Sequence, residues 1–103
     1  MSSIRVRAQE KDGVTEVRAL ITHPMETGQR KDANTGELIP AHFIQEVVCK
    51  HGDTVVMTAL WSGGVSRNPY LSFQFKGAAK GDTFSMNWSD NKGESDSVEV
   101  KIS

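Results

Sequence analysis

The sequence lacks several common features, and each absence excludes a class of protein. Cys49 is its single cysteine, so an intrachain disulfide is excluded and the redox compartment stays undecided. Charge of neither sign is in excess: 12 basic and 13 acidic residues give a net charge of -1, so no overall field favours nucleic acid or an acidic membrane. No run approaches the roughly 20 apolar residues of a membrane-spanning helix. Met1 leads to Ile4 without the apolar segment of a secretory signal, which by itself predicts the cytoplasm.

The sequence does contain many short segments in which apolar and polar residues alternate. At 103 residues there is room for one domain, 1–103, with a single modest core. The alternation predicts strands over residues 4–8, 14–23, 41–50, 54–61, 70–76, 83–88 and 98–102. No helical period is present, and about three inward residues per strand require two facing sheets. We therefore predict an all-β, immunoglobulin-like β-sandwich of about seven strands, with Trp61 or Trp88 filling the layer where antibody domains have a disulfide.

Two irregular segments are the predicted recognition surfaces. Residues 23–43 form a long polar excursion that holds two of the three histidines, and loops of this length are mostly functional or mobile. Residues 61–70 mix aromatic, small and polar groups around a double glycine, which either supplies turn dihedrals or lets a partner approach closely. The predicted partner-binding residues are His23, Met25, Arg30, His42, Trp61, Gly63, Gly64, Val65, Asn68 and Tyr70.

A metal centre is the alternative that the histidines raise. The potential ligands are His23, His42, Cys49 and His51, with Met25 and Met57 nearby in the sequence. Blue-copper sandwiches use cysteine, histidine and methionine, but they keep these ligands close together on one loop, unlike the spacing here. A superoxide-reductase type of iron site needs four histidines besides its cysteine, and the chain has three. We therefore predict no metal and no cofactor, and keep a small metal-binding sandwich as the alternative function.

Enzymatic catalysis finds little support in the sequence. Cys49 lies in an apolar strand, where a small buried residue is expected, and no helix is predicted whose N-terminus would activate its thiol. The acidic residues lie in turns and at strand ends, without a spacing that selects a pair for acid–base chemistry. The chain is therefore predicted not to be an enzyme.

One predicted strand points instead to assembly. Residues 54–60 carry no charge and no proline, although an exposed edge strand is normally protected by such residues. A strand of this kind must be covered, either by the second sheet of its own domain or by another chain.

The sequence resembles the SoxZ family of bacterial thiosulfate oxidation. The resemblance rests on four segments spread over nearly the whole chain: His-Pro-Met-Glu-Thr-Gly at 23–28, Ile-Pro-Ala-His-Phe-Ile at 39–44, the run 61–71 that begins Trp-Ser-Gly-Gly-Val-Ser, and Asp-Asn-Lys-Gly at 90–93. Together they are far more specific than any short motif.

The resemblance implies a fold, a partner and a location. It implies an immunoglobulin-like sandwich that forms a heterodimer with SoxY, contacts the other sulfur-oxidation enzymes transiently, and allows a homo-oligomer when isolated. SoxY carries sulfur intermediates on a C-terminal Gly-Gly-Cys-Gly-Gly arm, which this chain lacks, and Cys49 within a strand is no substitute. The family works in the periplasm and is exported with the signal-bearing partner, so the resemblance replaces the cytoplasmic prediction.

Overall fold

The computed structural model describes residues 3–62 and 64–103, which form seven β-strands and no helix. The strands are β1 (Ile4–Lys11), β2 (Val14–Ile21), β3 (Ile44–His51), β4 (Thr54–Leu60), β5 (Tyr70–Lys76), β6 (Thr83–Asp90) and β7 (Ser95–Lys101). The described residues include no helix that is long and apolar enough to cross a membrane.

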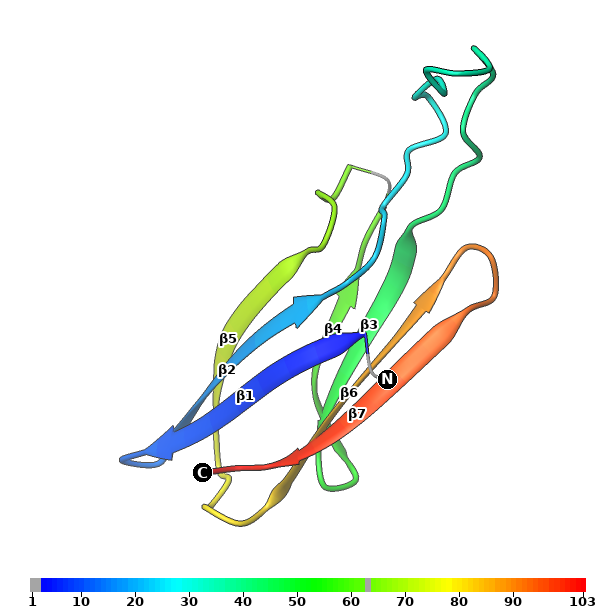
Figure 1. Cartoon of the computed structure of the whole chain (residues 1–103). Helices are drawn as coiled ribbons and strands as arrows, with labels where there is room; N and C mark the ends of the chain where they lie inside the picture. The colour runs from blue at the N-terminus through cyan, green and yellow to red at the C-terminus, as the bar shows by residue number, and fades with distance from the viewer. Residues whose placement is uncertain (1–2, 63) are drawn as a thin grey trace.

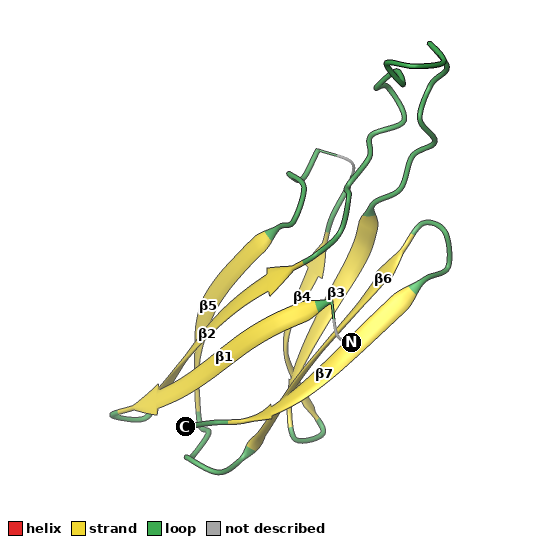
Figure 2. Ribbon diagram, in the orientation of Figure 1, coloured by secondary structure: helices red, strands yellow, loops and turns green. Residues whose placement is uncertain are grey.

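The strands form two antiparallel sheets that face each other (Figures 1 and 2). One sheet has the order β1-β2-β5 and the other has the order β4-β3-β6-β7. The predicted all-β sandwich of seven strands is therefore confirmed, as is the β3–β4 hairpin. Two predicted boundaries were too generous: β2 ends at Ile21 and β3 begins at Ile44. The backbone leaves the sheets at these points because the His23 amide donates to the Asn68 side chain and the His42 amide donates to the Glu26 carbonyl.

The core follows the alternation that predicted the strands. Val17, Ala19 and Ile21 on β2 are buried, and Val47 and Cys49 on β3 face them across the sandwich core. Every second residue of a strand points to the same face, so each strand contributes to the core only through one set of residues.

The central layer is filled differently from the prediction. Phe84 is fully buried, and its ring lies 6.2 Å from that of Phe73 and 6.1 Å from that of Phe75. Because Phe84 is in register with His51, the last residue of β3, these phenylalanines pack towards the end of the sandwich away from the arm. Trp88 is buried but contacts His23 near the end of the sandwich, and Trp61 lies beyond β4, only partly buried. Prediction from the sequence chose the largest side chains, whereas the register places the fully buried Cys49 and Met86 in the middle of the second sheet.

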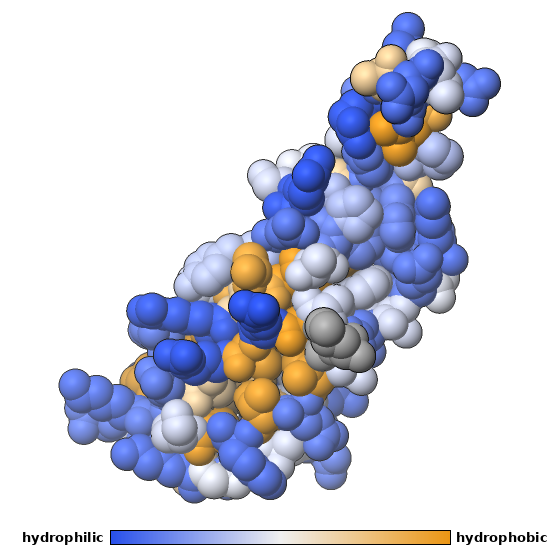
Figure 3. Space-filling view, viewed as in Figure 1, coloured by the Kyte–Doolittle hydropathy of each residue, from blue (hydrophilic) through white to orange (hydrophobic). Residues whose placement is uncertain are grey.

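The two sides of the sandwich are closed to different degrees. At the β1–β7 side, the chain end ties the sheets together: the Ser103 amide donates to the Ala8 carbonyl and its carbonyl accepts from the Glu10 amide. Figure 3 shows apolar side chains along the middle of this side, between polar borders. At the β4–β5 side, the inward residues Met57 and Phe73 are only partly buried. We call this side the open edge.

One buried polar group is left without a partner, and it yields a test of the core. Thr15 is fully buried on β2, and its Oγ1 has no hydrogen-bond partner among the described residues. Thr15→Val keeps the shape and removes the unsatisfied hydroxyl, so we expect the free energy of unfolding in urea to rise by about 1 kcal/mol. Thr22→Val, at an exposed position, is the control and should change little. A loss of stability in Thr15→Val would show that the hydroxyl is satisfied in solution.

Candidate functional site

Residues 22–43 form a projecting arm between β2 and β3. Two isolated bridges, Glu26–His42 and Lys31–Leu38, join its two limbs into an irregular hairpin. The arm extends beyond the end of the sandwich in Figure 1 and gives the molecule its length of 53 Å against a width of 24 Å. Gly28 has a φ of +86°, and a Cβ there would lie 3.1 Å from the Ala41 side chain, so this limb contact requires glycine.

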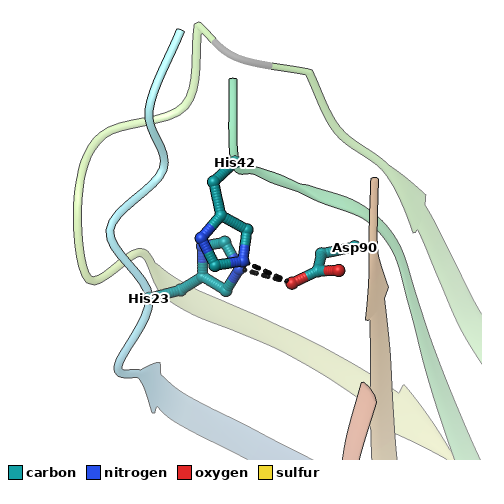
Figure 4. Close-up of side chains that lie close together, drawn as sticks. All are labelled: His23, His42 and Asp90. Atoms are coloured by element: carbon teal, nitrogen blue, oxygen red, sulfur yellow. Dashed lines mark hydrogen bonds and ion pairs between the residues drawn. The ribbon is translucent and has the colours of Figure 1, made fainter. Parts of the chain in front are cut away.

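The base of the arm is fixed by a cluster of three side chains, His23, His42 and Asp90, which we call the latch (Figure 4). His23 follows β2, His42 precedes β3, and Asp90 ends β6. Asp90 Oδ2 lies 3.1 Å from His23 Nε2 and 2.8 Å from His42 Nε2. The imidazole rings meet edge to face, with centroids 4.5 Å apart. The latch therefore joins the first sheet, the arm and the second sheet at one carboxylate.

The Asp90 carboxylate is buried and fully engaged. Its side chain has no exposed surface, and its other oxygen accepts the backbone amides of Lys92 and Glu94 at 3.0 and 2.9 Å. Burial by itself raises the pKa of Asp90, but the hydrogen bonds from His23, from His42 and from the two amides outweigh it, so the pKa is lowered. Asp90 is therefore an ionised acceptor that holds the arm in place.

The same three residues are the one cluster of potential metal ligands in the described part of the chain. The tautomer of His23 argues against metal binding in this arrangement. The Met25 amide donates to His23 Nδ1 at 3.1 Å, so Nδ1 has no proton and the neutral ring carries its proton on Nε2. Nε2 then donates to Asp90 and has no lone pair for a metal, whereas a ligating histidine donates its other N–H outward. The geometry favours a hydrogen-bonded latch.

The four potential ligands predicted from the sequence lie in three different places. His23 and His42 meet in the latch. Cys49 lies in the middle of β3, in register with Met57 and Met86, and is fully buried. His51 lies at the far end of β3, where Nε2 is 2.7 Å from Asp82. Prediction from the sequence placed His23 and His42 in one excursion and grouped them with Cys49 and His51, and it placed Asp90 in a turn.

The predicted partner-binding residues of the arm divide into buried and exposed groups. His23 is 3% exposed and Met25 is 5% exposed, and the Met25 sulfur accepts the Ile44 amide, so both residues support the arm from within. His42 is partly buried in the latch. Arg30 is exposed and pairs with Glu26, four residues earlier in the arm, with Nε 3.0 Å from the carboxylate. Arg30 is therefore the one residue of this group with an exposed side chain, and that side chain is already paired within the arm.

The second predicted segment, residues 61–70, lies beside the base of the arm. Asn68 bonds His23 twice, because its amide donates to the His23 carbonyl and its side-chain oxygen accepts the His23 amide. Trp61 and Val65 are partly buried, and Tyr70 is 60% exposed. Gly63 lies outside the described residues. Gly64 has no positive φ, and a Cβ there would meet only Ser62 Oγ at 3.8 Å, so the chain itself does not require glycine at this position.

Asp90→Asn tests the latch. The substitution removes the charged carboxylate that accepts hydrogen bonds from both histidines. We therefore expect a loss of about 2–3 kcal/mol in the free energy of unfolding. Asp53→Asn, in the exposed β3–β4 turn, is the matched control and should stay within about 0.5 kcal/mol of the wild type. Equal losses in the two variants would contradict the latch.

The pH dependence of stability in the wild type and in Asp90→Asn gives a separate prediction. Because the folded-state pKa of Asp90 is lowered, its stabilisation is complete above the unfolded pKa of about 3.9 and is lost as the pH falls through the folded value. The difference in stability between the wild type and Asp90→Asn should therefore shrink progressively as the pH falls below about 4. A difference that stays constant as the solution is acidified would show that the Asp90 carboxylate is not stabilised in its ionised form.

Cys49 is buried, and we expect its thiol to react slowly in the folded chain. Burial raises the pKa of its thiol from 9.0 to about 12, which lowers the thiolate fraction at neutral pH roughly thousandfold. We expect Ellman's reagent to modify Cys49 at least about 100-fold more slowly in the native chain than in the urea-unfolded chain. Comparable rates in the two states would mean that the thiol is accessible.

Comparison with known proteins adds a family and a fold. The family model for "Sulphur oxidation protein SoxZ" matches residues 4–101. None of the curated proteins matches the sequence. Among solved structures, a hypothetical protein from Pyrococcus horikoshii superimposes with a TM-score of 0.68 at 15% identity, covering 97% of this chain and 87% of its own. A superoxide reductase (neelaredoxin) from Archaeoglobus fulgidus gives 0.60 at 22% identity, covering 100% and 87%. At these identities the structural likeness shows the fold alone.

Proposed function

The chain belongs to the SoxZ family of sulphur oxidation proteins, and from this membership we propose that it is the non-catalytic subunit of a SoxYZ sulfur-carrier complex. In this proposal it binds SoxY, whose C-terminal cysteine arm carries the sulfur intermediates, and it gives docking surface to the thiosulfate-oxidising enzymes. We place the complex in the periplasm, with this chain exported together with SoxY.

The chemistry of the described side chains supports a role in binding. The cysteine that would have to carry sulfur is buried, and burial raises its pKa to about 12. The histidines nearest to each other are engaged in the latch, and His51 is engaged by Asp82. Because the thiol is buried and the histidines are already engaged by carboxylates, the proposal assigns the sulfur chemistry to the companion subunit.

The open edge is the surface that we propose for SoxY. β4 is an edge strand, and it differs from the edge strands β1, β5 and β7 because it contains no charged residue. It exposes 51% of Val55 and 78% of Leu60. Unpaired backbone groups beside apolar side chains invite another strand unless charge or proline protects them. This unprotected edge is the observation that carries the proposed binding mode.

The neighbouring loop extends the same surface. Trp61 and Val65 follow directly after β4 and are partly exposed. Gly64 is exposed and is not required by its own chain, so an approaching backbone would gain from the missing side chain. Aromatic residues with small residues around them are typical of the centre of a protein interface.

The proposal is tested by mixing the purified chain with SoxY and sizing the product by gel filtration with light scattering. We expect one peak at the mass of a heterodimer. Val55→Lys should weaken the complex at least about tenfold, because it places a charge on the edge that becomes buried. Ser97→Lys on the edge strand β7 is the matched control and should bind like the wild type. Two separate peaks for the wild-type proteins at micromolar concentration would defeat the proposal.

A further inference from the structure

The outer face of the β1-β2-β5 sheet carries a concentration of positive charge. The register places its outward residues in four rows: Arg5, Leu20 and Tyr70; Arg7, Arg18 and Ser72; Gln9, Glu16 and Gln74; and Lys11, Val14 and Lys76. Five of these twelve residues are basic and one is acidic, whereas the whole chain has 12 basic and 13 acidic residues. We call this surface the cationic face. Figure 3 shows strongly hydrophilic side chains over β1 and β2.

The positive charges on the cationic face are little neutralised. Arg18 pairs with Glu16 at 2.7 Å, but the exposed Arg5 and Arg7 have no ion-pair partner among residues 3–62 and 64–103. The remainder of the chain is acidic by the count above. The protein is therefore electrically asymmetric although its net charge is only -1.

Protection of the sheet edge explains only part of this arrangement. Arg7 lies directly opposite Arg18 across β1 and β2, and like charges in this relation destabilise a sheet. Lysine and arginine on an edge strand prevent unwanted pairing, which accounts for Arg5 and Arg7 on β1. Arg18, however, is on the central strand β2, which has neighbours on both sides. A facing arginine pair that costs stability at a non-edge position points to a binding role.

The shape and composition of the face fit a protein surface. Arg5, Arg7 and Arg18 line an open hollow of about 440 Å³, together with the exposed Leu20 and Tyr70. Arginine and tyrosine are enriched in protein interfaces, where tyrosine and leucine supply apolar area and arginine supplies directional hydrogen bonds to carboxylates. The acidic remainder of the chain would repel a long nucleic acid, which favours a partner of limited contact area.

We propose that the cationic face is the docking surface for an acidic patch on the thiosulfate-oxidising enzymes, used transiently while SoxY occupies the open edge. This inference rests on the proposed function and adds to it the surface and the chemistry of the second partner. Charge complementarity across such a surface raises the association rate more than the lifetime of the complex, as suits a carrier that visits several enzymes in turn.

The test uses the reconstituted SoxYZ complex with the purified thiosulfate-oxidising enzymes, and it measures KM for the complex at several NaCl concentrations. The variant is Arg7→Gln with Arg18→Gln. The control is Lys50→Gln with Lys80→Gln, which removes the same charge from exposed positions elsewhere on the chain. We expect the arginine variant to raise KM about five- to tenfold with kcat unchanged, and to make KM nearly independent of salt. The lysine control should match the wild type.

The other outcomes separate this inference from the proposed function. If the wild-type chain and SoxY do not form a complex, the proposed function fails. If the complex forms but the two double variants have the same KM, then any change in KM comes from the net charge of the chain. In that case the cationic face is not the docking surface. Loss of SoxY binding in the arginine variant would make this face the permanent interface and overturn the inference. Tight binding of the complex to a single-stranded DNA 20-mer through Arg7 and Arg18 would overturn it as well.

Discussion

One buried carboxylate determines how this molecule presents its surfaces. Asp90 receives hydrogen bonds from His23, from His42 and from two backbone amides of its own turn, so it joins both sheets and the base of the arm. The buried carboxylate is matched by imidazole donors, and for His23 the donating nitrogen is set locally: the Met25 amide occupies Nδ1 and leaves Nε2 to donate. Because Asn68 in turn bonds the His23 backbone, the loop after β4 is held by the same cluster. The arm and this loop are therefore positioned by one network.

The fold was predictable from the sequence because its cause is local. Alternation on each strand selects the buried face, and turns such as that at Gly52 fix the hairpins, so strand number and facing followed directly. The latch was not predictable, because His23 and Asp90 are 67 residues apart and only the three-dimensional register brings them together. The sequence did place His23 and His42 at opposite ends of one excursion. What it missed was the acceptor, which has the appearance of an ordinary turn residue.

The open edge and the cationic face suit two different kinds of contact, one permanent and one transient. The open edge is apolar and uncharged, with Leu60 exposed at its end, and such surfaces suit permanent partners that exclude water. The cationic face, with Arg7 opposite Arg18, is charged and solvent-exposed, and its attraction to an acidic surface is strong at long range and readily broken. β4 lies in one sheet and β1 and β2 lie in the other, so we expect a companion bound at β4 to leave the outer face of β1 and β2 accessible.

The central claim is that the chain acts by binding a partner subunit, SoxY, through its uncharged edge strand β4. Hydrogen–deuterium exchange of the free chain and of its complex with SoxY tests this most directly, because new strand pairing protects backbone amides that are otherwise open to solvent. The account predicts slower exchange over Thr54–Leu60 and over residues 61–66, with Ile4–Lys11 unchanged. Protection confined to Ile4–Lys11 and Val14–Ile21, with β4 exchanging as in the free chain, would contradict it.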